Sequence, residues 1–150
     1  MGTCRRYEAT QENDLFEQRM KSRIAFSITE LDVGGAEKAL TELICRIDRN
    51  LFDPALFVLS AAPSEPTLVE KLKLHGVPVH FLGLQRWPQL VRTVVRFVRI
   101  LRSLRPHLVQ SFLFHANLVS RVAARIAGIP IVVSSLRVAE RAAQWHVLLD

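Results

Sequence analysis

The chain has 150 residues, of which 49% are hydrophobic and 23% charged, which is ordinary for a globular domain and excludes a disordered or fibrous protein. Its 20 Lys and Arg against 14 Asp and Glu give a formal net charge of +6, which favours an anionic partner such as phosphate, nucleic acid or an acidic lipid surface. No apolar run has the length of a membrane span or the character of a secretory signal, and Cys4 and Cys45 form no disulfide framework or metal-ligand cluster, so a cytoplasmic setting is the simplest.

Residues 1–21 are polar and mixed in charge. They predict a disordered tail, followed by one globular domain over residues 22–150. Because Met20 immediately precedes the first expected strand, a start at Met20 in place of Met1 would leave the fold intact. Mass analysis of the native amino terminus distinguishes the two starts.

Beyond the tail, short apolar runs alternate with longer segments of helical spacing. The runs predict strands over residues 23–29, 55–60, 77–82, 107–113 and 129–135. The segments predict helices over residues 36–46, 66–75, 88–104 and 116–127, and an incomplete helix from about Val138. This alternation is typical of βαβ units, so we expect an α/β fold with a Rossmann-like, doubly wound parallel sheet in the strand order 3-2-1-4-5.

Glycine and proline mark the ends of these elements. Gly76 and Gly128 follow expected helices, where a left-handed residue commonly ends the helix, while Pro78, Pro106 and Pro130 lie near the starts of strands. The chain stops at Asp150 within a segment that still has helical spacing. We therefore expect the domain to be truncated at its carboxyl end.

The first candidate site is the glycine pair Gly34-Gly35, which follows the first strand and opens a helix. Glycine lets another group approach the main chain closely, and the free amides at a helix start favour phosphate or carboxylate. The alternative is a tight turn in which Glu37 stabilises the helix start. The segment matches neither a GxGxxG fingerprint nor a Walker A motif.

The second candidate is His115, between the fourth strand and its helix. In the order 3-2-1-4-5, strands one and four are neighbours at the switch point, where open α/β sheets bind ligands. Gly34, Gly35 and His115 are then expected to line one crevice, in which an imidazole can exchange hydrogen bonds or an imidazolium can answer developing negative charge. The alternative is a helix-start histidine that bonds only to nearby backbone.

Two further candidates are basic. Arg92, Arg96 and Arg99 share one face of the expected helix 88–104, with Arg102 at its edge, so this face either meets anionic lipid headgroups or is the solvated side of an ordinary crossover helix. Arg137 follows the fifth strand, where it either holds a phosphate or sugar hydroxyl or forms a salt bridge.

Taken in order, several segments resemble the amino-terminal domain of family 4 retaining glycosyltransferases, which have the two-domain GT-B architecture. The resemblance spans about residues 21–150 and rests on the following segments: Leu31-Asp32-Val33-Gly34-Gly35-Ala36-Glu37-Lys38, Gly76-Val77-Pro78-Val79, His115-Ala116-Asn117-Leu118 with Arg121, and Gly128-Ile129-Pro130 leading to Ser135-Leu136-Arg137.

The resemblance implies transfer of a sugar from a nucleotide-diphosphate donor to a glycan or lipid-linked acceptor, with retention of configuration. It also implies that the reaction has no obligatory metal and no cofactor. The nucleotide sugar is a substrate of the reaction. The resemblance places Gly34 and Gly35 at the donor diphosphate and His115 beside the transferred sugar as the catalytic residue. Asn117 and Arg137 are the expected acceptor or phosphate contacts.

The family's nucleotide-binding domain would follow Asp150, so we expect little or no activity from this chain alone. The alternative function is a non-catalytic binding domain that pairs with a separate half. A nucleic-acid partner is not expected, because the arginines lack interleaved aromatic residues. We expect a cytoplasmic protein with peripheral contact at the inner face of the membrane. The donor base, the sugar and the acceptor are not specified by these residues.

Overall fold

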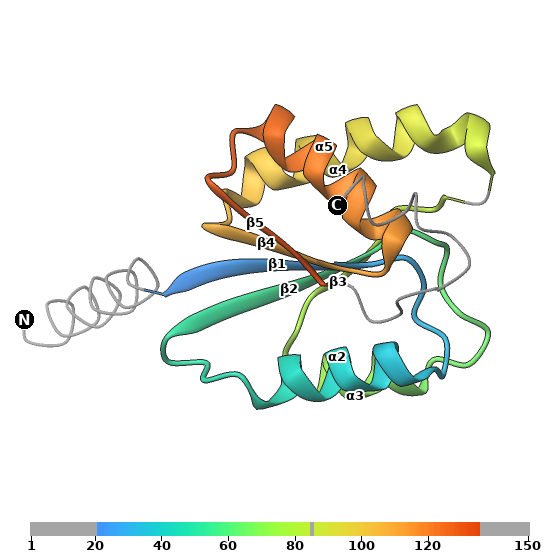
Figure 1. Ribbon diagram of the computed structural model, residues 1–150. Coiled ribbons are helices and arrows are strands. Elements are labelled where there is room, and N and C mark those ends of the chain that lie inside the picture. The colour runs from blue at the N-terminus through green and yellow to red at the C-terminus, as the bar shows by residue number, and fades with distance from the viewer. Residues whose placement is uncertain (1–20, 85, 136–150) are drawn as a thin grey trace, which may run out of the picture.

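The computed structural model describes residues 21–84 and 86–135. Five strands form one parallel sheet: β1 (Ser22–Ile28), β2 (Phe52–Val58), β3 (Val79–Phe81), β4 (Leu108–Phe112) and β5 (Ile131–Ser135). Their spatial order is β3-β2-β1-β4-β5 (Figure 1), and every neighbouring pair is parallel. The predicted Rossmann-like sheet and its strand order are thereby confirmed.

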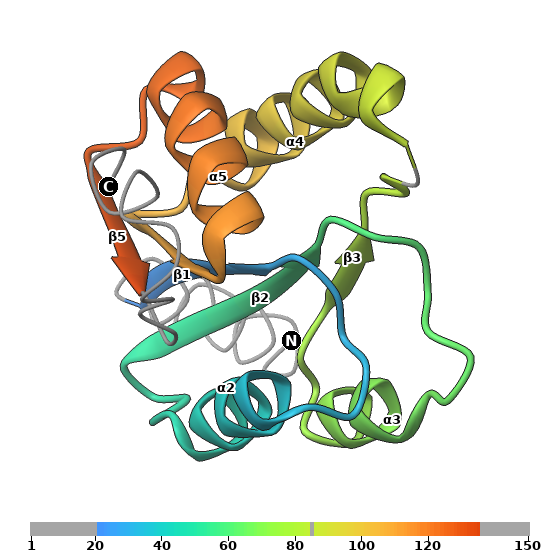
Figure 2. The same ribbon diagram turned by 45° about the vertical axis from the view of Figure 1, so that its right-hand side comes forward.

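Helices cover both faces of this sheet. Helices α2 (Gly35–Arg46) and α3 (Thr67–Leu74) lie together on one face, and α4 (Leu90–Leu104) and α5 (Phe114–Ala127) lie together on the other (Figures 1 and 2). A short 3-10 turn, Trp87–Gln89, precedes α4. Consecutive parallel strands need such crossover helices, and each helix buries its apolar stripe against the sheet.

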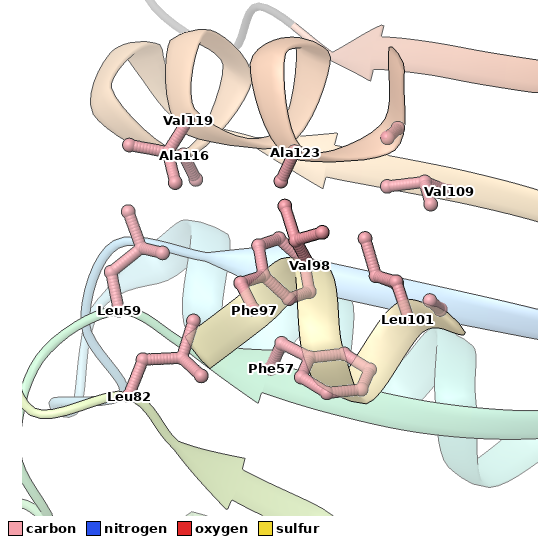
Figure 3. Close-up of a cluster of buried hydrophobic side chains, with 12 residues drawn as sticks. Phe57, Leu59, Leu82, Phe97, Val98, Leu101, Val109, Ala116, Val119 and Ala123 are labelled. Carbon is pink, nitrogen blue, oxygen red and sulfur yellow. The ribbon is translucent and has the colours of Figure 1, made fainter. Parts of the chain in front are cut away.

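Side chains of β1 alternate between two hydrophobic cores, as a strand buried on both faces requires. Ala25 packs in the core beneath α4 and α5, whereas Phe26 packs in the core beneath α2 and α3. In the first core, Phe97 of α4 lies against Phe57 of β2, with ring centroids 4.9 Å apart. Figure 3 shows Phe97 and Leu101 among the side chains of the sheet and α5. This packing fixes α5 over the centre of the sheet.

The ends of the helices follow the glycine pattern. Gly76 after α3 has φ 67°, and Gly128, which caps α5, has φ 76°. Each is accompanied by backbone bonds to the last turn, from Val77 to Leu72 and from Ile129 to Ala124, both 3.0 Å. Helix α4 ends differently, because Arg105 takes the left-handed conformation without being glycine.

Element boundaries differ from the predicted ones in places. Strand β2 begins at Phe52 and runs through Pro54, which is tolerated because β3 pairs only with Leu56, Phe57 and Val58 further along. Helix α5 begins at Phe114, two residues before the predicted start, so His115 lies inside its first turn. The other elements lie within about three residues of the predicted bounds.

Several expectations concern residues outside the described part of the chain. Residues 1–20 of the tail predicted over residues 1–21, the start at Met20, Arg137 and the incomplete helix from Val138 all fall there. Within residues 21–84 and 86–135, no helix combines the length and the apolar character that crossing a membrane requires.

Candidate functional site at the switch point of the sheet

The candidate site lies where β1 and β4 end side by side. The two strands pair in parallel up to Ile28 and Phe112. The chain then leaves β1 toward α2 on one face of the sheet, and leaves β4 toward α5 on the other (Figure 2). This divergence opens the sheet edge, which is the predicted switch point.

Leu113 makes the turn from β4 into α5 with an unusual backbone. Its φ of 71° and ψ of 153° fall in a region that glycine normally occupies and that costs other residues about 1–3 kcal/mol. The Leu113 side chain packs against the core beneath α2 and α3, which helps to hold the turn. The sharp reversal starts α5 immediately, and the Leu113 carbonyl accepts the Asn117 N–H at 2.9 Å. His115 is thereby presented, exposed, in the first turn of α5.

A cavity of about 430 Å³ lies between α4 and α5, beside His115, within the usual size range for a small-molecule site. His115 and Thr29, the residue after β1, form part of its wall together with Arg86. The remaining lining residues are apolar: Leu84, Leu90, Val94, Leu118, Val119 and Val122. Apart from His115, sequence reasoning named none of these residues as site residues, because the cavity forms only when α4 and α5, which β4 separates in the sequence, pack together.

Gly34 and Gly35 lie at the start of α2 and are not among the residues that line this cavity. Helices α2 and α5 cover opposite faces of the sheet (Figure 1), and the glycines and His115 lie at the amino-terminal ends of these two helices. The structure therefore brings Thr29 to His115. That the glycine pair shares a crevice with His115 stays a prediction.

The two glycines differ in their surroundings. A Cβ on Gly34 would overlap the carboxylate of Glu37, which is nearly buried and folds back over the first turn of α2. A Cβ on Gly35 would meet no atom within 4 Å, and Gly35 has no left-handed backbone that requires glycine. Neither packing nor conformation within the described fold therefore accounts for glycine at position 35.

Asn117 is fully buried, and neither Nδ2 nor Oδ1 of its amide has a hydrogen-bond partner among the described residues. A buried amide without partners is costly. The Asn117 side chain is therefore enclosed by the domain, with its amide donors and acceptor still unused among the described residues. Its role stays a prediction.

Polar contacts that the sequence did not reveal tie α5 to the sheet. The hydroxyls of Ser27 on β1 and Ser120 on α5 are hydrogen-bonded at 2.6 Å and fully buried. A second bond joins the same helix to the edge strand: the Arg121 Nε–H of α5 donates to the Ser134 hydroxyl of β5 at 3.1 Å. These bonds hold the helix that presents His115 in one position on the sheet.

The basic face of α4 is as predicted. Arg92, Arg96 and Arg99 are exposed, and none of the ion pairs found among the described residues involves α4. Arg102 at the edge of that face donates to the Ile126 carbonyl of α5 at 2.9 Å. The apolar residues Val91 and Val95 of α4 are also exposed, by 73% and 42%. The outer face of α4 therefore mixes arginine with exposed valine.

Titratable groups with shifted pKa values lie away from the cavity. Burial, with a smaller effect from the Arg96 charge, lowers the pKa of His80, whose ring stacks on Phe57. The hydrogen bond from Lys71 lowers the pKa of Glu42, and burial raises the pKa of the Cys45 thiol. In residues 21–84 and 86–135, no group of three or more His, Cys, Asp or Glu side chains is placed to hold a metal ion.

The parallel sheet and its switch point define a Rossmann-like α/β domain, with the cavity beside that switch point. The model of the glycosyl transferase 4-like domain matches residues 34–148. The chain therefore belongs to the family of glycosyl transferase 4-like domains, as the sequence motifs predicted. Among curated proteins, none gives a significant match to the sequence.

Solved structures share the fold. HepE of Anabaena, crystallised with UDP and glucose, is 23% identical, with a TM-score of 0.59 over 75% of this chain. MurG of Acinetobacter baumannii is 16% identical, with a TM-score of 0.58 over 84% of this chain. A deacetylase of the teicoplanin biosynthetic pathway is 11% identical, with a TM-score of 0.55 over 77% of this chain.

The chain spans 29% of HepE, 39% of MurG and 65% of the deacetylase. At these identities the likeness establishes the fold, and the deacetylase shows that the fold alone does not specify the reaction. The function of this chain is therefore inferred from its family and from its site residues.

Proposed function

We propose that this domain is the acceptor-side, amino-terminal part of a retaining glycosyltransferase, which moves a sugar from a nucleotide diphosphate to a glycan or lipid-linked acceptor. The reaction needs no metal or other cofactor in this proposal. The observation that most supports it is the placement of His115, exposed in the first turn of α5 at the switch point and lining a cavity of about 430 Å³. Membership of the glycosyl transferase 4-like family supports the same assignment.

In the proposal, the donor diphosphate lies at the amino terminus of α2. The open space over Gly35 supports this position, because a ligand can approach the main chain of Gly35 closely, although the Glu37 carboxylate lies over the neighbouring Gly34. The free amides and dipole of the helix start favour an anion. The complex of HepE with UDP and glucose supports a nucleoside diphosphate as the donor class.

His115 is proposed to lie beside the transferred sugar. An imidazole at this edge of the sheet can form a hydrogen bond with a sugar hydroxyl. It raises the rate of transfer if it stabilises the charge that develops in the transition state. The acceptor would occupy the cavity side of His115, where Thr29 Oγ1 is buried without a hydrogen-bond partner among the described residues. Arg137 is proposed to hold a phosphate or sugar hydroxyl of the acceptor.

Catalysis is proposed to require a second domain. A glycosyl transfer site must position both substrates and exclude water, whereas this chain matches only a part of HepE and MurG. We therefore expect the purified chain to show little or no turnover with a panel of sugar nucleotides and glycan or lipid acceptors. Robust turnover by the chain alone would refute this dependence.

The assignment itself is tested in cells that make the protein. Extracts from cells with the unaltered gene, with His115→Ala and with His75→Ala are compared for transfer from labelled sugar nucleotides. His75 is an exposed histidine at the end of α3, away from the cavity, and serves as the matched control. His115→Ala should lower transfer roughly a hundredfold, and His75→Ala should leave it unchanged. Equal transfer in all three would refute the role of His115.

A second candidate is a non-catalytic domain that pairs with a separately encoded half. It is favoured by β5, an edge strand that exposes Ile131, Val132 and Val133 by 51%, 36% and 40%. Exposed apolar side chains on a strand edge are typical of a surface that pairs with another element. Co-purification of a stable partner chain, with no transfer activity in the complex, would favour this alternative.

A further inference from the structure

The cavity between α4 and α5 has a polar end and an apolar body. His115 and Thr29 lie at the carboxyl edge of the sheet. Leu118 and Val122 then follow His115 at intervals of three and four residues, so they continue the same face of α5 over about 10 Å. Leu90 and Val94 of α4 also line the cavity. An apolar groove thus runs along α5 away from His115.

This groove is open to solvent. Leu118 and Val122 are exposed by 42% and 45%, although both lie on a helix that packs well elsewhere. Leaving apolar side chains exposed along a groove is unfavourable unless a ligand covers them, and such surfaces commonly mark binding sites. A purely polar acceptor would gain little from this lining, whereas a hydrocarbon chain would be stabilised by every methylene it buries.

The charges around the groove favour an anionic group on that hydrocarbon. The sequence holds no Asp or Glu from Lys71 to Ala139, yet this stretch holds more than half of the 20 Lys and Arg. Arg86 lies in the wall of the groove, and its side chain is exposed. Arg92 and Arg96 follow on the outer face of α4. The Arg86 guanidinium can pair with a phosphate, and helices α4 and α5 bring no carboxylate to the wall. Glu30, which follows Thr29, is the acidic residue next to a wall residue in the sequence.

We propose that the groove binds the hydrocarbon chain of a lipid phosphate, with the phosphate beside Arg86 and the chain over Leu118 and Val122. This inference rests on the proposed function and narrows it, because it makes the acceptor a long-chain alkyl or prenyl phosphate whose head lies near His115. A water-soluble glycan has no counterpart to the apolar body of the groove.

Binding is tested without any transfer reaction. The purified chain is titrated calorimetrically with dodecyl phosphate below its micelle-forming concentration, with butyl phosphate, and with dodecyl trimethylammonium. One dodecyl phosphate should bind per chain, with a negative heat-capacity change. Because each buried methylene should tighten binding by roughly three- to fourfold, dodecyl phosphate should bind at least thirtyfold tighter than butyl phosphate. It should also bind at least tenfold tighter than the cationic amphiphile.

Variants locate the site. Leu118→Trp and Val122→Trp fill the groove and should each weaken dodecyl phosphate at least tenfold. Leu43→Trp replaces a leucine that is exposed by 45% on α2, on the other face of the sheet, so it should change binding less than twofold. Thermal unfolding curves confirm that each variant is folded. With two groove positions, the test survives the loss of one variant.

The charge is tested in the same way. Arg86→Gln should weaken dodecyl phosphate about fivefold, while Arg125→Gln, at the far end of α5, should leave it within twofold. Affinity that is independent of chain length, or that Leu118→Trp and Leu43→Trp change alike, would overturn the proposal. Binding to anionic vesicles without binding of the single amphiphile would overturn it too.

The outcome also separates this inference from the proposed function. If dodecyl phosphate fails to bind but cells transfer sugar to a water-soluble glycan through His115, the lipid groove is wrong and the transferase stands. If dodecyl phosphate binds in the groove but His115→Ala leaves transfer unchanged, the lipid site stands and the proposed role of His115 falls.

Discussion

The hydroxyls of Ser27 on β1 and Ser120 on α5 are joined by a buried hydrogen bond of 2.6 Å. The bond links the central strand of the sheet to the helix that presents His115 to solvent. Because both hydroxyls are fully buried, one donates to the other within the core, and neither can turn to water. The position of the candidate catalytic residue therefore depends on a polar contact deep in the core.

The Ser27–Ser120 contact predicts a specific pattern of stabilities. Ser27→Ala and Ser120→Ala should each lower the free energy of unfolding by about 1–3 kcal/mol, because each leaves one buried hydroxyl unpaired. The double variant should be less destabilised than the sum of the two. Urea unfolding measures all three, with the exposed Ser103→Ala as a control that should change stability by less than about 0.5 kcal/mol. Additive losses would show that the hydroxyls act independently.

The carboxylate of Glu37 predicts weakened anion binding at α2. It folds over Gly34, so it occupies the end of the helix where a phosphate would gain from the dipole. Glu37→Gln should tighten the binding of pyrophosphate by roughly two- to fivefold. The substitution removes a carboxylate whose interaction with the helix dipole is worth up to about 1 kcal/mol and which competes with the anion. Calorimetry compares Glu37→Gln with Glu70→Gln, which makes the same change of charge at an exposed residue of α3. Tightening of equal size in both would mean that only net charge matters.

The lowered pKa of His80 predicts that stability falls in mild acid. Burial, followed by the Arg96 charge, disfavours the protonated ring in the folded state, so the unfolded chain binds a proton more readily. The contribution of the neutral His80 ring to the free energy of unfolding is complete above the unfolded pKa of about 6.5. It is lost as the pH falls below that value.

His80→Phe, which keeps an aromatic ring against Phe57, should therefore lose less stability than the unaltered chain between pH 7.5 and pH 5.5. His75→Gln serves as the control and should keep the original slope. Urea unfolding midpoints at the two pH values measure the effect, and identical slopes in His80→Phe and the unaltered chain would contradict it.

The outer face of α4 predicts binding to anionic membranes. Replacing Arg92, Arg96 and Arg99 with Gln should weaken partition onto vesicles of anionic phospholipid by about 1 kcal/mol for each arginine. A matched triple, Arg46, Arg49 and Lys73 to Gln, removes the same charge from the α2 and α3 side and should have a much smaller effect. Co-sedimentation with vesicles measures both. If the two triples behave alike, the arginines are simply the solvated side of a crossover helix.

Much of the fold could be predicted because its signals are local in the sequence. The left-handed Gly76 and Gly128 lie where helices were expected to end, and the alternation of apolar runs and helical segments was enough for the strand order. The backbone of Leu113 could not be predicted, because a leucine at φ 71° is held by packing between distant segments. The same is true of Arg105, where Pro106 and the next strand require the turn that glycine usually makes.

The candidate site was only partly predictable. His115 could be found because its position after the fourth strand follows from the topology. The groove could not, since Leu84, Val94 and Leu118 meet only after α4 packs on α5. The burial of Asn117 depends equally on which face of α5 meets the sheet. Its segment predicts an acceptor or phosphate contact, and the local sequence does not specify that the side chain is buried.

In the proposed function, the donor diphosphate lies at the start of α2 and the transferred sugar lies beside His115. Amide and histidine ring resonances of the 15N-labelled chain, followed while millimolar UDP-glucose is added, test both placements at once. The variant with Gln at positions 92, 96 and 99 is used, so that α4 does not compete for the anion. The account predicts that the largest saturable shifts occur at Gly35 and Ala36 and that His115 shifts with the same midpoint. Shifts confined to other surfaces, or a different midpoint for His115, would contradict it.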